Sequence, residues 1–251
     1  AIVERARENV ALLAGAKPTS LVFTANGSEA NAGALYGAVL GAAASEDRKA
    51  QKRITRLFVS AIEHDSVRVA AAALSESMPG LRLYEIPVTA DGVVDPSALR
   101  LQLLEGKGRA LVSVMAANNE TGAVQSITDI VNVVRTEGQD SLVHVDAVAA
   151  AGHMPVAFDA WDADYLSLSS HKLGGPQGVG VLIVKEGAPF APLVHGHQEA
   201  RRRGGTENVA AIAGFGVAAA ADFTTENETQ RTLRDDFETA LKKMAPNTVI
   251  F

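Results

Sequence analysis

The stretch SLSSHKLGGPQGVG, Ser167 to Gly180, decides how the rest of the sequence is interpreted. It places Lys172 after two serines and a histidine, and directly before a turn that is rich in glycine. A lysine in such a place is a surface charge, a phosphate ligand or a covalent catalyst. The segments on either side of this stretch must distinguish among these three roles.

Short apolar or β-branched runs alternate with segments of helical length along the chain. We expect strands over the ranges 21–24, 54–60, 81–86, 110–115, 142–145, 165–167 and 179–184. We expect helices between them over the ranges 28–43, 66–77, 96–104 and 127–137. Strands separated by helices indicate βαβ units, and strands that are apolar throughout indicate a sheet covered on both faces. The sequence therefore predicts an α/β fold, a three-layer sandwich with a mainly parallel sheet.

The pattern changes near Asp222, where ETQRTLRDDFETALKKM has the spacing of a charged amphipathic helix. We expect a large domain over residues 1–221 and the start of a smaller C-terminal domain over residues 222–251. The chain opens in the helical pattern IVERARENVALLAGA without a capping residue, and it stops on the strand-like run PNTVIF. We therefore expect a piece of a longer protein that lacks an N-terminal segment and most of the smaller domain.

The composition argues against several classes of function. The chain has 251 residues, 47% of them hydrophobic, and its net charge of −6 gives no reason to expect a nucleic acid or a membrane surface as partner. No apolar run reaches the ~20 residues that span a bilayer. No secretory signal opens the chain, so we expect a cytoplasmic protein. The sequence contains no cysteine, which excludes disulfides, thiolate metal sites and a cysteine nucleophile within these residues.

Polar side chains follow the predicted strands at the edge where open parallel sheets bind ligands. The segment TANGSEAN turns into a helix through Gly27 and Ser28. This turn is either a phosphate site at a helix N-terminus or an ordinary turn in which Ser28 caps its own helix. His64 follows the second strand, where it is either a solvent-facing residue or part of a site.

The later strands end in further polar residues. Asn118 and Asn119 either shape a turn or orient a polar ligand. Asp146 closes an apolar strand, and a buried carboxylate there requires a cation or strong donors. The sixth strand ends in the group Ser169, Ser170, His171 and Lys172.

Several other chemistries lack their sequence patterns. No Gly-x-Ser-x-Gly elbow is present, and Lys172 precedes its glycines rather than following them as in a P-loop. His195, His197 and Glu199 alternate as metal ligands do, but no fourth ligand is evident and we expect no metal. The arginines 201–203 indicate a solvated or anion-facing turn in this acidic chain. Pyridoxal phosphate (PLP) fits, because it needs an anion site, a carboxylate, a flat group and a lysine.

Together these segments resemble the class V aminotransferase family, and within it most closely the cysteine desulfurases. The motifs that carry the resemblance are LVFTANGSEAN, EHDSV, ANNETGAVQ, HVDAVAAAG, SLSSHKLGGPQGVG and RRRGGTENV. The resemblance implies a PLP-dependent transferase that takes sulfur from L-cysteine, leaves alanine and an enzyme persulfide, and serves iron–sulfur cluster assembly. It also implies a homodimer with composite active sites and a sulfur-acceptor protein as partner.

The resemblance further implies a role for each matched position. Lys172 would form the Schiff base with the cofactor and move protons, and His64 would stack on the cofactor ring. Asp146 would pair with the ring nitrogen, and Asn119 would bond near the phenolic oxygen. The residues expected to hold the phosphate are Gly27, Ser28, Ser169 and His171, with Thr206 reaching the phosphate of the neighbouring subunit.

Two departures from the family pattern bear on activity. Ala149 stands where the family has a glutamine that bonds the cofactor, and the nucleophilic cysteine of a desulfurase is absent from these residues. Two alternatives therefore stay open. One is another class V enzyme, such as an aminotransferase or a selenocysteine lyase, and the other is a degenerate homologue without catalysis.

Overall fold

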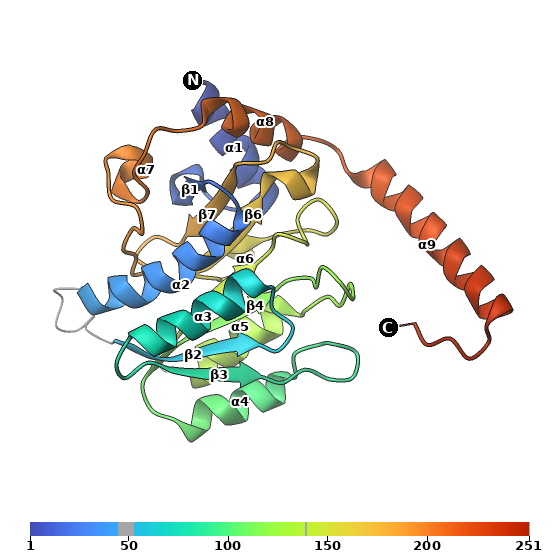
Figure 1. The fold of residues 1–251 in the computed structure, drawn as a ribbon, viewed down its shortest axis with the longest axis horizontal. Coiled ribbons are helices and arrows are strands. Elements are labelled where there is room, and N and C mark those ends of the chain that lie inside the picture. The colour runs from blue at the N-terminus through green and yellow to red at the C-terminus, as the bar shows by residue number, and fades with distance from the viewer. Residues whose placement is uncertain (45–52, 139, 251) are drawn as a thin grey trace.

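The fold is that of a computed structural model, which describes residues 1–44, 53–138 and 140–250. Its centre is a seven-stranded sheet in the order β1-β7-β6-β5-β4-β2-β3 (Figure 1). The strands are β1 (Leu21–Thr24), β2 (Ile54–Ser60), β3 (Arg82–Ile86), β4 (Arg109–Met115), β5 (Leu142–Asp146), β6 (Tyr165–Ser169) and β7 (Gly180–Val184). The helices are α1 (Ile2–Ala14), α2 (Gly27–Ala44), α3 (Asp65–Ser77), α4 (Pro96–Glu105), α5 (Ile127–Glu137), α6 (Phe158–Trp161), α7 (Gln198–Arg201), α8 (Val209–Ala219) and α9 (Thr224–Met244).

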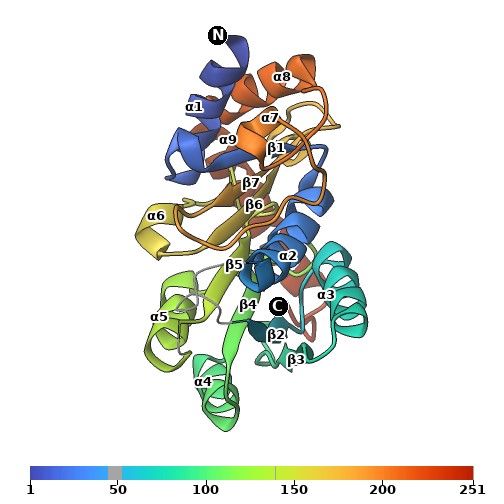
Figure 2. The same cartoon turned by 90° about the vertical axis from the view of Figure 1, so that its left-hand side faces the viewer.

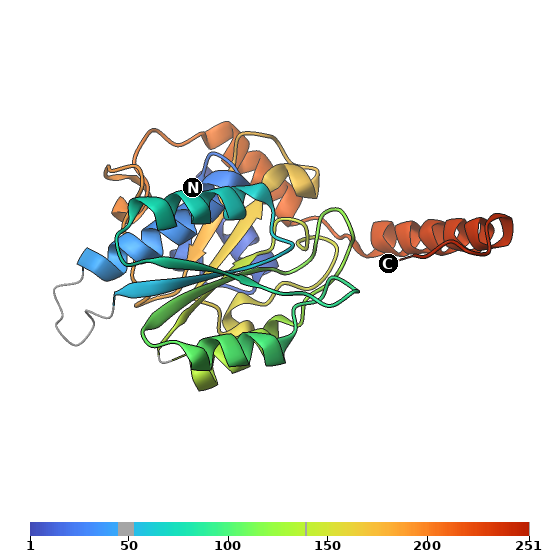
Figure 3. The same cartoon turned by 60° about the horizontal axis from the view of Figure 1, so that its bottom comes forward.

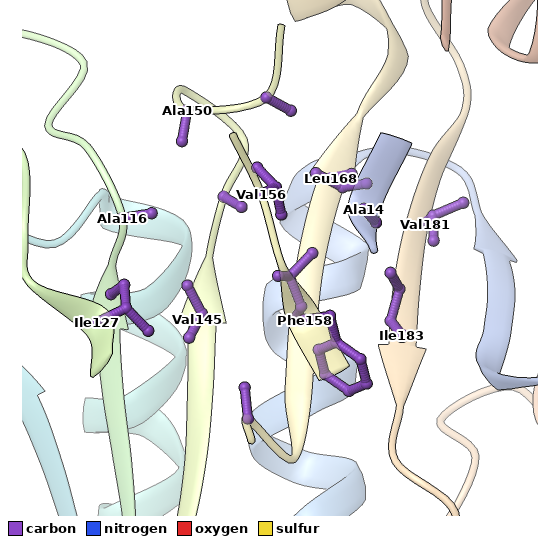
Figure 4. Close-up of a cluster of buried hydrophobic side chains, with 14 of the residues drawn as sticks. Ala14, Ala116, Ile127, Val145, Ala150, Val156, Phe158, Leu168, Val181 and Ile183 are labelled. Carbon is purple, nitrogen blue, oxygen red and sulfur yellow. The ribbon is translucent and has the colours of Figure 1, made fainter. Parts of the chain in front are cut away.

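Helices cover both faces of the sheet. On one face α2 and α3 pack in a cluster that includes Ala34, Val67 and Leu182. On the other face α1, α4, α5 and α8 enclose a second cluster, and the two layers are seen edge-on in Figure 2. Figure 4 shows part of this second cluster, which includes Phe158 of α6 and Ile183 of strand β7. The predicted α/β architecture is confirmed.

The sheet is parallel except at β7, which runs antiparallel to both of its neighbours. The first residue of β7, Gly180, therefore pairs with Thr24 at the end of β1 and with Ser169 at the end of β6. A Cβ atom at Gly180 would lie 2.5 Å from the carbonyl carbon of Asn26. The reversed strand thus brings the turn after β1 against the turn after β6.

Most predicted strands and helices are found within one or two residues of their expected ends. The strands over 21–24 and 54–60 and the helix over 127–137 have the bounds expected of them. Strand β5 continues through Asp146 because that residue pairs with Met115 and Ser167 on the neighbouring strands. The prediction of a strand-like segment at the C-terminus was wrong for residues 246–250, which form no strand. Phe251 lies outside the described residues.

A row of polar side chains crosses the middle of the sheet. His144 on β5 is fully buried, with Nδ1 2.8 Å from Ser113 Oγ on β4 and Nε2 3.0 Å from Ser167 Oγ on β6. Burial lowers the pKa of His144 to about 3, because the charged imidazolium would lose its hydration. The ring is therefore neutral at physiological pH, and both of its nitrogens have a hydroxyl partner.

Helix α2 accommodates a neighbouring backbone segment along a stripe of glycines. The amide of Ala191 donates to the carbonyl of Gly37 at 2.9 Å. One turn further on, a Cβ atom at Gly41 would lie 2.7 Å from Cα of Phe190. Glycine leaves room for this contact, which accounts for the glycines at positions 37 and 41 of the helix.

Helix α9 projects away from the sheet, as Figures 1 and 3 show, and none of its residues is buried. In the described part of the chain no single helix is both long enough and apolar enough to span a bilayer. Helices α8 and α9 meet that criterion only when taken together, and a bend of 70° separates them.

Candidate functional site

A cavity of about 280 Å³ opens at the carboxyl ends of β4, β5 and β6, beside the start of α2. This is the edge of the sheet at which the sequence predicts a site. The cavity is lined by the predicted residues Gly27, Ser28, His64, Asn119, Asp146, Ser169, His171 and Lys172. They come from segments more than a hundred residues apart, and the fold brings them together.

Thr206 lies elsewhere. It is exposed and lines a separate cavity of about 180 Å³, together with Thr24, Glu199 and Arg203. Within one chain Thr206 therefore does not share the cavity of Lys172. Its expected role was in the site of a neighbouring subunit, and that role stays a prediction.

Asp146 forms the buried end of the cavity. Its Oδ1 atom accepts from the amide of Val148 at 2.9 Å, and its Oδ2 atom accepts from Nδ2 of Asn31 at 2.7 Å. Burial raises the pKa of Asp146, while these two hydrogen bonds and the nearby His64 act in the opposite direction. A cation placed against this carboxylate would compensate the cost of its burial.

Asn31 links Asp146 to His64. Its Nδ2 atom also donates to Ser66 Oγ at 2.9 Å, and Ser66 Oγ lies 2.8 Å from Nδ1 of His64. The amide of Ser66 donates to the same Nδ1 atom at 3.1 Å, so a neutral ring carries its proton on Nε2. His64 is thus held as the N-cap of α3, with its ring at the cavity wall.

The turn between β1 and α2 lines the cavity through Asn26, Gly27 and Ser28. Helix α2 begins at Gly27, and Asn26 caps it by accepting from the amide of Glu29 at 2.8 Å. The alternative in which Ser28 caps the helix was wrong, since Ser28 lies inside the first turn and lines the cavity. A Cβ atom at Gly27 would lie 3.0 Å from Cγ2 of Val148 and 3.1 Å from Cβ of Ser169, so a larger residue would crowd this position. First-turn amides have no acceptor within the helix and attract anions.

Lys172 lies in a short 3₁₀ turn, Ser170–Leu173, directly after β6. The turn ends at Gly174 with a φ of 75°, a left-handed conformation that glycine adopts without strain. Within the turn Ser169 Oγ lies 2.9 Å from Nδ1 of His171. The glycines after Lys172 therefore have a local purpose, because they reverse the chain into β7.

The two asparagines after β4 have different surroundings. Asn118 accepts from the amides of Glu120 at 2.9 Å and Thr121 at 2.8 Å, and it donates to the carbonyl of Ile62 at 2.9 Å. Asn118 therefore shapes the turn, and Asn119 is the one that lines the cavity. The turn-shaping role that the sequence left open thus belongs to Asn118, and a ligand-orienting role for Asn119 stays a prediction.

One of the candidate metal ligands, Glu199, forms an ion pair with Arg7. Glu199 is buried and accepts from both terminal nitrogens of Arg7, at 2.8 and 2.9 Å. The amide of Phe23 donates to the same carboxylate at 2.9 Å. In the residues that the structure describes, no group of three His, Cys, Asp or Glu side chains is arranged to hold a metal ion.

Two of the three arginines 201–203 have partners within the chain. Arg203 pairs with Glu29 at 2.9 Å, and Arg202 donates to the carbonyls of Thr19 and Leu21, each at 2.9 Å. Arg201 is exposed and has a φ of 66°. The expectation of a solvated or anion-facing turn therefore fits Arg201, which is exposed, and Arg203, which faces the carboxylate of Glu29.

Sequence reasoning missed Asn26, Asn31 and Ser66, which line the cavity, and Glu63, which does not line it but bonds to the end of β4. Asn31 lies one helical turn after Gly27, which places both on the same face of α2. It is also an amide within a run of alanine and glycine, which was the available signal. Glu63 and Ser66 flank His64 in the motif EHDSV, and only the fold reveals that they are buried or bonded.

The donor set around the cavity fits PLP. Asp146 could supply a buried carboxylate for the ring nitrogen, the start of α2 could supply amides for the phosphate, and Lys172 could supply an amine. The Oδ1 atom of Asn31 is buried and has no hydrogen-bond partner among the described residues. A bound polar ligand would satisfy such an atom.

Comparison with known proteins gives a consistent answer. The sequence profile of the family Aminotransferase class-V matches residues 1–247. The chain is 37% identical to the cysteine desulfurase IscS of Dictyoglomus turgidum over 96% of its length, and 43% identical to a cysteine desulfurase of Frankia over 99%. In both cases it spans 59% of the relative.

Solved structures agree with the sequence relatives. A NifS-like protein superposes with a TM-score of 0.86 at 33% identity, covering 97% of this chain and 65% of that one. A NifS-like protein from Rickettsia africae gives 0.82 at 30% identity, covering 96% and 64%. With this agreement of motifs, fold and relatives, the chain belongs to the class V aminotransferase family.

Proposed function

We propose that this chain carries the PLP site of a cysteine desulfurase, which removes sulfur from L-cysteine and leaves alanine. The observation that carries the proposal is the shared cavity of Asp146 and Lys172, with Asn31 holding the carboxylate. The names of the sequence relatives support the substrate. Residues 1–221 are proposed to form the cofactor-binding domain, and residues 222–251 the start of a smaller domain.

The proposed roles follow from the contacts in the cavity. When bound, PLP withdraws electrons from the bonds at the α-carbon of an amino acid. The carboxylate of Asp146 stabilises a proton on the ring nitrogen, and Asn31 fixes the direction of that carboxylate. His64 offers a flat face to the ring, and Asn119 is proposed to bond near its phenolic oxygen. Lys172 holds or moves a proton at Nζ.

Binding of the phosphate is assigned to the other wall of the cavity. The amides of Gly27 and Ser28 lie at the positive end of the helix dipole of α2, and the Ser169 hydroxyl and His171 imidazole lie beside them. We assign Thr206 to the phosphate of a neighbouring subunit, so a homodimer with composite sites is part of the proposal. Its support is that Thr206 is exposed and outside the cavity of its own chain.

Completion of the reaction requires a nucleophile from outside these residues. The sequence has no cysteine, so the sulfur must pass to a thiol that this chain does not supply. We propose that the sulfur then passes to an acceptor protein and serves iron–sulfur cluster assembly in the cytoplasm. The name IscS of one relative supports this use.

A second candidate is a class V enzyme with another substrate, or a homologue that has lost catalysis. Ala149 favours it, because this residue lines the cavity and its methyl group cannot donate a hydrogen bond to a ligand. Assaying sulfide and alanine from cysteine, with the thiol-bearing remainder of the protein present, separates the two candidates. Release of neither product from a protein that binds PLP favours the second.

The cofactor site is tested by adding PLP and recording the visible absorption band, followed by borohydride reduction and peptide mapping. The wild-type chain should gain the band and a covalent label on Lys172. Lys172→Ala should lose both, while Lys17→Ala, which removes an exposed lysine distant from the cavity, should retain them. An unlabelled wild type, or a label on another lysine, would sink the proposed site.

A further inference from the structure

Glu63 is a buried acid that the proposed mechanism does not use. It lies in the turn between β2 and α3, directly before His64, and only 4% of it is exposed. Glutamate is almost never buried in this way unless it is paired. The surroundings of this carboxyl therefore require an explanation.

The carboxyl of Glu63 connects two elements of the site. Its Oε1 atom accepts from Ser60 Oγ at 2.5 Å and from the amide of Met115 at 2.5 Å. Met115 is the last residue of β4 and pairs with Asp146 on β5. The side chain therefore ties the turn that carries His64 to the strand end beside Asp146.

The surroundings of the second oxygen favour the protonated form of the acid, although the two bonds to Oε1 act in the opposite direction. Oε2 is buried and has no hydrogen-bond partner among the described residues. A charged oxygen in that place would be uncompensated, whereas a protonated one is not charged. Burial, and then the negative charge of Asp146, raise the pKa of Glu63 to about 8. The other titratable groups that line the adjacent cavity are His64, Asp146, His171 and Lys172.

We propose that Glu63 is a positioning residue that works as a neutral acid, setting His64 relative to Asp146 and leaving Asp146 as the anion of the cavity. The proposal rests on the proposed function, since it explains how the residues that face the cofactor are placed. Glu63 does not line the cavity itself and acts through the backbone of Met115 and the turn before α3.

The charge state has a consequence for stability in the absence of cofactor. An unfolded chain ionises Glu63 near its ordinary pKa of 4.5, whereas the folded chain keeps the proton up to about pH 8. Unfolding therefore releases a proton in this window, and the contribution of Glu63 to stability falls as pH rises through it. Glu63→Gln, which is neutral at every pH, lacks this loss.

The first experiment measures thermal unfolding of the chain without PLP from about pH 5 to about pH 9. The melting temperature of Glu63→Gln minus that of the wild type should rise up to about pH 8 and then level off. Glu76→Gln is the matched control, because it removes the same charge from an exposed position on α3. A difference for Glu63→Gln as flat as that of the control overturns the neutral acid.

The second experiment measures PLP affinity by absorption titration at neutral pH. Glu63→Gln keeps an oxygen acceptor for Ser60 and Met115 and should bind PLP within about twofold of the wild type. Glu63→Ala loses that acceptor and should bind about tenfold more weakly, which corresponds to about 1.4 kcal/mol. Equal affinity of the two variants overturns the positioning role. A wild type that binds no PLP overturns the proposed function together with that role, while the unfolding experiment still decides the charge of Glu63.

Discussion

Replacing Arg7 with methionine removes one half of a buried ion pair and should destabilise the protein strongly. The guanidinium of Arg7 makes two hydrogen bonds to Glu199, at 2.8 and 2.9 Å, and lies 4.8 Å from the centre of the Phe23 ring. The side chains of Arg7 and Glu199 are 11% and 2% exposed. Water therefore cannot replace the lost partner of the carboxylate.

The magnitude follows from what surrounds Glu199 after the substitution. Breaking a buried pair by removing one partner costs about 3–5 kcal/mol. Glu199 keeps its bond from the amide of Phe23, and the positive charges of Arg202 and Arg203 act on it. We therefore expect Arg7→Met to lower the free energy of unfolding by a value near the lower end, about 3 kcal/mol.

Urea unfolding at neutral pH measures this loss as a lower midpoint with an unchanged slope. Arg5→Met is the matched control on the same helix, since Arg5 is exposed and its loss should change stability by less than about 0.5 kcal/mol. The double variant Arg7→Met/Glu199→Gln should lose less stability than the sum of the two single variants. A loss below about 1 kcal/mol for Arg7→Met, or simple additivity in the double variant, would refute the reasoning.

Three further substitutions test the packing and the electrostatics of the fold. Gly41→Ala should cost about 1–3 kcal/mol in urea unfolding, because the added methyl group overlaps the backbone of Phe190. Arg201→Gly should raise the free energy of unfolding by about 1 kcal/mol, because it removes a side chain from a residue with a φ of 66°. His144→Gln should flatten the fall of stability in acid. The folded ring has a pKa of about 3 against 6.5 unfolded, so the wild type loses stability as pH falls through this window.

A control or a contradicting outcome is defined for each of these three substitutions. Gly33→Ala on the same helix places its methyl group 3.4 Å from Leu182 and should be tolerated, so equal losses at both glycines would contradict the packing argument. An unchanged or lower stability of Arg201→Gly would mean that the turn is not strained by its side chain. Parallel pH curves for His144→Gln and wild type would show that the ring titrates normally when folded.

The strands and the class of fold were predictable because burial leaves a mark on the sequence. The runs over 21–24 and 54–60 are apolar and end at polar residues, so their bounds could be read directly. The strand before Asp146 was expected to end at residue 145, since a carboxylate rarely continues an apolar run. Asp146 belongs to β5 because Asn31 and the amide of Val148 satisfy it there.

The rest depends on contacts between distant parts of the chain. The bond from Asn31 to Asp146 joins residues 115 positions apart, and no local pattern marks either as the partner of the other. The direction of β7 has no local mark either, because its residues are apolar on both faces. Helix α7 was not expected, since Glu199 and Ala200 have positive φ values of 47° and 54° that no propensity favours. The role of Thr206 and the domain boundary near 221 stay predictions.

The reversed strand β7 also limits how this protein can change during evolution. Val181 and Leu182 face opposite sides of the sheet, and both sides are apolar. A shift of the strand register by one residue would therefore bury no polar group. The pattern of polar and apolar residues therefore does not specify the register of β7. We infer that the close contact of Gly180 with Asn26 specifies it instead. Insertions between Lys172 and Gly180 should be rare among natural variants. They would shift Lys172 relative to the start of α2, which lines the same cavity.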